Sequence, residues 1–508
     1  MKAPRSQGET FQDVMTRRLA RREFLKGAVA SASLLASGVE FSAAAQTPSL
    51  TFTPIKLTTE DRLIVPPGYT SQTLIRWGDP ILPGAPAFNP LAQTAAAQAG
   101  QFGYNNDFLA FFPFSREPFQ FAARDTAGLL AVNHETASGT LMFPNFSNNT
   151  LTREQVDIMI AAHGVSVVEI EYLPKTTWYA PRGWRYKNIS SYNRRITGET
   201  EIELTGPAAG HPMLQTTADP TGRRVRGTLN NCAGGKTPWG TMLTGEENTN
   251  NYFGNMGRLA TTDPRRAMLT RYGFATGASS NRWENFYDRF DVSKEPNEPF
   301  RFGYVVEIDP FDPYSTPKKR TALGRVKHEG ATTALAKDGR VAVYTGDDER
   351  FEYIYKFVTK GTFNPNEHRA NLNLLDEGTL YVAKFNDDGT GVWIPLVAGQ
   401  GALAAWSQAE ISFFTRGAAD LVGATKMDRP EDIETNPANG KVYAVLTNNT
   451  RRGTTGNPGT DKANPRVGNP NGHIIELTEK GGDAAATTFN WEIFLLCGDP
   501  SVADQGTY

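Results

Sequence analysis

The sequence has few cysteines, no surplus of charge and no long apolar run. Only Cys232 and Cys497 occur in 508 residues, which excludes a disulfide scaffold but leaves a single bridge between them possible. The 52 Lys and Arg residues balance 54 Asp and Glu residues, so nucleic acid is not expected as a specific partner. The apolar stretch 27–38 is too short to span a bilayer, and we expect no stable membrane anchor.

The first 45 residues have the composition of an export signal. Arg21-Arg22-Glu23-Phe24-Leu25-Lys26 precedes the apolar stretch, and small residues follow at 42–45. This order resembles a twin-arginine signal, with an ordinary Sec signal as the alternative. We therefore expect cleavage near Ala45, the twin-arginine export machinery as a partner, and a periplasmic or extracellular location. Twin-arginine export serves proteins that load a cofactor before export, which favours a metal-bearing protein.

Strand patterns dominate the rest of the chain. Short runs of Val, Ile, Leu and Tyr, such as 128–132 and 341–345, have Gly, Pro, Asn or Asp close to an end. The 48 Gly and 32 Pro residues fit many tight turns. Helical periodicity is confined to 152–163 and 403–413.

This pattern predicts an all-β protein, a β-propeller with short helical insertions that occupies residues 46–508 as one domain. A barrel or a stacked sandwich is the alternative. We expect six blades, although no internal period is clean enough to count them. Residues 451–471 are rich in Gly, Asn, Pro and Thr and predict an exposed loop, in which Arg451 and Arg452 either meet an anion or are simply solvated.

Acidic residues recur directly after these strand patterns. The groups are Asn133-His134-Glu135, Gly245-Glu246-Glu247-Asn248, Lys327-His328-Glu329, Gly346-Asp347-Asp348-Glu349-Arg350 and Asp428-Arg429-Pro430-Glu431-Asp432. Adjacent carboxylates beside a buried strand are unfavourable unless a cation or a guanidinium compensates them, although the group at 346–350 alone could be a solvated turn. Carboxylates suit Ca²⁺, whereas the thiol in Asn230-Asn231-Cys232 suits a softer transition metal. The pattern predicts a mixed metal site at one end of the propeller channel.

The order of several such segments resembles the PhoX-type alkaline phosphatases. The segments are 232–248, 306–313, 321–331, 346–357 and 429–431. The resemblance covers most of residues 60–500 and implies an exported phosphomonoesterase with a cluster of iron (Fe³⁺) and calcium ions in the channel. Phosphate monoesters would be its substrates, and we expect a monomer.

The same resemblance implies roles for individual residues. Cys232 would be the thiolate ligand of iron, and Glu329 a carboxylate ligand of the same part of the cluster. Arg429 would face the phosphate and, with Glu431 and Glu329, form the catalytic set. The other implied metal ligands are His134, Glu135, Glu246, Glu247, Asp347, Asp348 and Glu431.

Two further expectations concern the end of the chain and rival functions. Relatives continue beyond the segment equivalent to 495–500, whereas this chain ends at Tyr508, so we expect a propeller that is shortened at its C-terminal end. A calcium-dependent propeller lactonase or phosphotriesterase is the nearest rival enzyme, and a binding propeller with structural calcium is the rival without activity. Cys232 argues against the rival enzyme, because a calcium site needs no thiolate.

Overall fold

The computed structural model describes residues 52–56, 58–114, 126–176 and 182–499. The predicted signal, residues 1–45, lies outside the described residues. The chain divides into two compact units, one of residues 1–73 and 495–508 and the other of Leu74–Phe494. All elements that carry the predicted site lie in the second unit.

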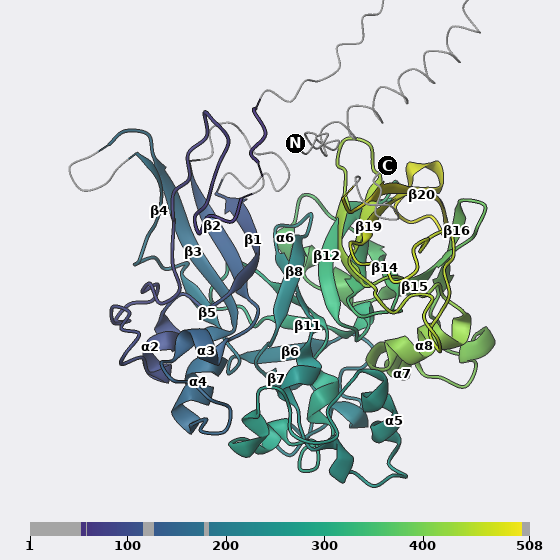
Figure 1. The fold of residues 1–508 in the computed structure, drawn as a ribbon, viewed down its shortest axis with the longest axis horizontal. Coiled ribbons are helices and arrows are strands. Elements are labelled where there is room, and N and C mark those ends of the chain that lie inside the picture. The colour runs from purple at the N-terminus through teal and green to yellow at the C-terminus, as the bar shows by residue number, and fades with distance from the viewer. Residues whose placement is uncertain (1–51, 57, 115–125, 177–181, 500–508) are drawn as a thin grey trace, which may run out of the picture. The chain divides into compact units, whose positions relative to one another are not determined.

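Four sets of four sequential strands follow one another in this unit (Figure 1), and within each set consecutive strands pair. The strands are β1 (Asn106–Pro113), β2 (Ala127–His134), β3 (Gly164–Leu173) and β4 (Gly183–Tyr186); β8 (Asn231–Lys236), β9 (Met242–Glu246), β10 (Val305–Ile308) and β11 (Lys318–Arg320); β12 (His328–Leu335), β13 (Arg340–Asp347), β14 (Ile354–Thr362) and β15 (Gly378–Phe385); and β17 (Pro430–Thr435), β18 (Val442–Leu446), β19 (His473–Glu479) and β20 (Thr488–Leu496).

Four further strands extend these sets into sheets of five, six and nine strands. They are β5 (Arg194–Ile196), β6 (Glu201–Thr205), β7 (Arg224–Arg226) and β16 (Thr390–Pro395). β16 lies between β15 and β20 and so joins the third and fourth sets into one sheet.

The first strands of the four sets lie side by side. β8 lies against β1 and β12, and β12 also lies against β17. Radial sets of four strands whose first strands meet are typical of a propeller. The predicted all-β, propeller-like fold is therefore confirmed, while the number of six blades stays a prediction.

Helices are short insertions between the strands. Their bounds are α2 (Ala95–Gly100), α3 (Gly139–Met142), α4 (Arg153–Ala162), α5 (Pro264–Arg271), α6 (His368–Asn371), α7 (Gln408–Phe413) and α8 (Thr415–Val422). The helix predicted at 152–163 is α4, which begins with a capping box between Thr152 and Gln155. Among the described helices, none has both the length and the apolar character that a membrane span requires.

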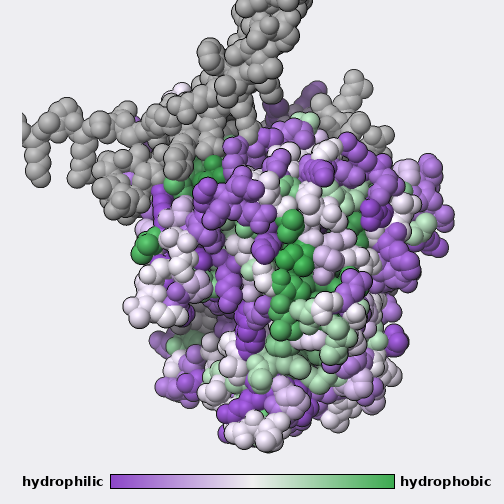
Figure 2. All heavy atoms as spheres, turned by 90° about the vertical axis from the view of Figure 1, so that its right-hand side faces the viewer, coloured by the Kyte–Doolittle hydropathy of each residue, from purple (hydrophilic) through white to green (hydrophobic). Residues whose placement is uncertain are grey.

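The apolar faces of the sheets and helices form the core. Trp239, Tyr353 and Tyr355 are buried in one cluster with residues of β13 and β14. The face of the molecule in Figure 2 is largely hydrophilic, with apolar residues gathered in a central band. Within the described residues neither Cys232 nor Cys497 forms a disulfide, so the possible bridge between them is not formed.

Candidate metal centre

Each set of four strands presents side chains from two equivalent positions. One is the second residue of the first strand, and the other is the residue that directly follows the second strand. The pairs are Asp107 with Glu135, Cys232 with Glu247, Glu329 with Asp348, and Glu431 with Thr447. The acidic motifs of the sequence are thus one structural feature repeated four times.

The backbone around these positions is the same in all four sets. The residue before each first strand accepts a hydrogen bond from the backbone N–H of the residue after the second strand, with N···O distances of 2.9, 3.0, 3.0 and 3.1 Å for Glu135, Glu247, Asp348 and Thr447. A shift of register follows in each first strand, next to the ligand-bearing residue. Such a bulge changes the direction of a side chain and is common beside active sites.

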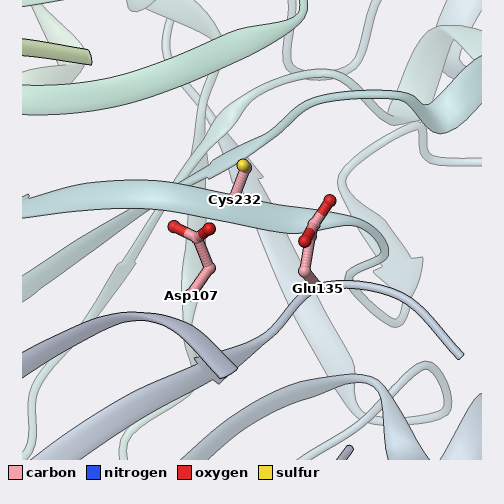
Figure 3. A group of neighbouring side chains, drawn as sticks. All are labelled: Asp107, Glu135 and Cys232. Atoms are coloured by element: carbon pink, nitrogen blue, oxygen red, sulfur yellow. The ribbon is translucent and has the colours of Figure 1, made fainter. Parts of the chain in front are cut away.

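The side chains from different sets converge on Cys232. Asp107, Glu135 and Cys232 each offer one ligand atom, and these atoms lie within 4.8 Å of one another (Figure 3); Cys232, Glu247 and Glu329 form a second such group. The Sγ atom of Cys232 lies 3.1 Å from a carboxylate oxygen of Glu329. We call the whole set the acidic cluster; its members are Asp107, Glu135, Cys232, Glu247, Glu329, Asp348 and Glu431.

Burial and mutual repulsion make the acidic cluster unfavourable without a cation. Burial, with the charge of Asp348 close by, raises the pKa of Glu247 to about 8. Burial and the charge of Glu247 raise the pKa of Glu329 to about 10, and burial and Asp348 raise that of Glu431 to about 7. The pKa of the Cys232 thiol is also raised, by burial and then by Glu329. Each shift marks a site where added positive charge would be stabilising.

Protein cations compensate the acidic cluster only in part. Arg429 donates to both carboxylate oxygens of Asp348, at 2.9 and 2.7 Å, and to Glu431 at 3.2 Å. Lys327, a second cation near Glu247, is paired at 3.0 Å with Glu349 rather than with a member of the acidic cluster. Asp347 and Asp348 are both buried, so the motif at 346–350 is not a solvated turn.

The donor set fits the ions that the sequence analysis expects. Carboxylate oxygens in this number suit Ca²⁺, a hard cation that takes six to eight oxygen ligands. The thiol at the centre suits iron and has no use in a calcium-only site. The residues present therefore fit both ions.

Three residues predicted as ligands have other partners. His134, Glu246 and Asp347 each precede a member of the acidic cluster, and successive strand residues point to opposite faces. His134 contacts the Ser166 hydroxyl at 2.6 Å, Glu246 pairs with Lys319 at 2.7 Å, and Asp347 accepts from Arg416 at 2.8 Å. The structure brings together the other predicted residues, Cys232, Glu329, Glu247, Glu135, Asp348 and Glu431, with Arg429 beside them.

Asp107 is the member of the acidic cluster that sequence reasoning missed. It is a single acid in Asn105-Asn106-Asp107, outside the adjacent acidic pairs that drew attention. The sequence does hold one signal, because Asn105-Asn106-Asp107 matches Asn230-Asn231-Cys232 at its two asparagines. The structure explains this match, since Asn105 and Asn230 both adopt positive φ, 57° and 53°. Asn tolerates this left-handed conformation better than most residues.

Comparison with known proteins agrees with this geometry. The family model described as alkaline phosphatase PhoX matches residues 50–508. The chain is similar to the solved structure of Pseudomonas fluorescens PhoX in complex with vanadate, a transition-state analogue, with 43% sequence identity and a TM-score of 0.83. That likeness covers 90% of this chain and 78% of the other. Comparison with curated proteins gave no match.

Fold, cluster and comparisons together define the class of this protein as an all-β, metal-dependent phosphatase that hydrolyses phosphate monoesters. The chain belongs to the PhoX alkaline phosphatase family. The predicted family and enzyme activity are thereby confirmed.

Proposed function

We propose that the acidic cluster is the active site of an exported alkaline phosphatase and that it binds iron and calcium. The observation that carries this proposal is the thiol of Cys232 lying within 4.8 Å of carboxylate oxygens from its own and two other sets of strands. A buried thiolate among carboxylates is unfavourable by itself, whereas a thiolate that binds iron is stabilised by the metal charge.

The residues divide by their distance from the thiol, since a carboxylate oxygen of Glu329 lies 3.1 Å from the sulfur of Cys232. Cys232 and Glu329 would hold iron, while calcium would be held by the remaining carboxylates, Asp107, Glu135, Glu247, Asp348 and Glu431. When bound, such cations polarise the phosphoryl group and activate an oxygen nucleophile, so no Ser or Thr nucleophile is required.

Arg429 would bind the phosphate. Its Nε and Nη2 atoms donate to Asp348 and Glu431, and among the described residues its Nη1 atom has no hydrogen-bond partner. The side chain is 26% exposed, so Nη1 can reach a substrate while the rest of the guanidinium is fixed. A fixed guanidinium neutralises charge on the equatorial phosphoryl oxygens as the ester bond breaks. Glu329 and Glu431 would complete the catalytic set around the same phosphoryl group.

The replacement Cys232→Ala tests the metal assignment. We expect loss of iron, of the visible thiolate-to-iron absorption and of roughly 100-fold or more of phosphatase activity. The readouts are metal quantification, an absorption spectrum and hydrolysis of p-nitrophenyl phosphate by the purified protein. Cys497→Ala is the matched control and should keep all three. A Cys232→Ala protein with native iron and activity would refute the assignment.

We also propose export of the enzyme as a monomer through the twin-arginine machinery, to the periplasm or beyond. The motif at 21–26 and the small residues at 42–45 support this route. Replacing Arg21 and Arg22 by Lys should retain the phosphatase in the cytoplasm, which cell fractionation measures. Unchanged export would favour a Sec signal instead.

A further inference from the structure

The connection between β18 and β19, residues 447–472, contributes Arg452 to a buried ion pair with Asp428, the residue before Arg429. The sequence analysis expects an exposed loop here, with Arg452 solvated or bound to an anion. Residues 451–471 do form a loop that is largely exposed, but Arg452 is not solvated: it is 1% exposed, and its Nε atom donates to Asp428 at 2.7 Å. We propose that Arg452 is a positioning residue that acts through Asp428 to hold Arg429 in its phosphate-binding geometry.

Asp428 is the centre of a buried hydrogen-bond network. Besides Arg452, its carboxylate accepts from the side-chain amides of Asn449 at 3.0 Å and Asn469 at 3.2 Å. Its backbone N–H donates to Asn464 at 2.9 Å. All these partners belong to the connection 447–472, which therefore encloses Asp428 on several sides.

Arg452 also fixes the residues around Asp428. Its Nη2 atom donates to the carbonyl of Lys426 at 2.7 Å, and its guanidinium carbon lies 4.9 Å from the centre of the Phe351 ring. The backbone of Phe351 in turn donates to the carbonyl of Met427 at 2.9 Å. The segment 426–428 is thus held by charge, hydrogen bonds and packing at once.

Arg429 follows this segment in a strained conformation. Its φ is 35°, and it precedes Pro430, which further restricts its backbone. Such a strained conformation persists only where the surrounding structure determines it. The hydrogen bonds around Asp428 hold the backbone before Arg429 in place. The resulting conformation of Arg429 directs its guanidinium at Asp348.

The fourth set of strands is specialised in this way. At the position of Arg429 the other three sets have Asn105, Asn230 and Lys327. At the position that directly follows the second strand, the other three sets have an acid and the fourth has Thr447. The fourth set contributes a guanidinium in place of one carboxylate. The connection that begins at Thr447 then folds back to support it.

This inference rests on the proposed phosphate-binding role of Arg429, and the test separates the two. The variants are Arg452→Met, Arg429→Met and their combination, with Lys356→Met as the matched control. Lys356 forms an equally buried ion pair with Glu479, at 2.8 Å, and within the described residues the hydrogen bonds of this pair go to groups outside the acidic cluster. The measurements are metal content, the inhibition constant of vanadate, and kcat and KM on p-nitrophenyl phosphate.

We expect Arg452→Met to keep its metals but to bind vanadate about 10-fold more weakly, because a small displacement of a charged donor has large effects in an active site. The double variant should bind vanadate no more weakly than Arg429→Met alone. Lys356→Met should lower the unfolding midpoint and leave vanadate inhibition unchanged. Arg452→Lys, which keeps the charge, should retain part of the affinity and serves as the test if Arg452→Met does not fold.

The outcomes are distinguishable. If Arg429→Met leaves vanadate inhibition unchanged, the proposed role of Arg429 fails. If Arg429→Met weakens inhibition but neither Arg452 variant does, or if the effects are additive, the positioning role alone is overturned.

Discussion

Neighbouring carboxylates at the strand ends have opposite electrostatic surroundings. Glu246 and Glu247 are both buried. Glu246 pairs with Lys319 and accepts four further hydrogen bonds, whereas Glu247 faces Asp348 and Glu135. Asp347 and Asp348 show a similar division, since Asp347 pairs with the fully buried Arg416. The fold balances charge on the side that packs against the core. It leaves an excess of negative charge on the side where cations would bind.

The same substitution at adjacent residues should therefore have different effects. Glu246→Gln would leave the Lys319 ammonium, 0% exposed, without its counter-charge, and we expect the free energy of unfolding to fall by about 3 kcal/mol. Glu247→Gln removes a charge from the acidic cluster. We expect the metal-free protein to keep or gain stability and the purified enzyme to lose metal and activity.

The metal content of each purified variant is quantified first. The metals are then removed with a chelator, and urea unfolding measures the stability of the metal-free protein. Glutamine is isosteric with glutamate at both positions, so each variant is the control for the other. Equal losses of stability would show that the two carboxylates have similar surroundings and would contradict the division described here.

Much of this site could be predicted, because strand ends, acidic motifs and a lone thiol are local features. The resemblance to PhoX enzymes added the expected metals and the role of Arg429. What the sequence could not decide is which residue of each pair faces the acidic cluster. The extra residue in each first strand shifts the register, so counting alternate residues along a strand does not identify the face.

The role of Asp107 and the burial of Arg452 were missed for different reasons. Asp107 has no acidic neighbour, and its equivalence to Cys232 depends on a four-fold repeat of backbone geometry that has almost no sequence identity. Arg452 lies in a segment with the composition of an exposed loop. Its burial depends on Asp428, 24 residues away, and a pairing of this kind cannot be read from local composition.

The pH dependence of stability should also distinguish Glu247 from Glu246, with a smaller effect than the substitutions. In the metal-free protein the pKa of Glu247 is about 8, against an ordinary value of 4.5, because of burial and Asp348. The folded state then binds more protons than the unfolded state between these values. Stability present below pH 4.5 is lost as the pH rises through 8, by up to about 1.4 kcal/mol per pH unit for this group.

Bound cations keep the cluster ionised and should abolish this loss. His163, whose pKa burial lowers to about 4, has the opposite effect, but it acts only below its ordinary value of 6.5. Urea unfolding between pH 6.5 and 8, with and without a chelator, therefore reports chiefly on the carboxylates. Burial lowers the pKa of Lys319 and of Lys356 to about 8, so these two groups oppose the loss only near the upper end of the interval. We expect the chelated protein to lose stability across this interval and the metal-loaded protein to keep it. If the chelated protein is as stable at pH 8 as at pH 6.5, the acidic cluster does not carry the uncompensated charge on which the metal assignment depends.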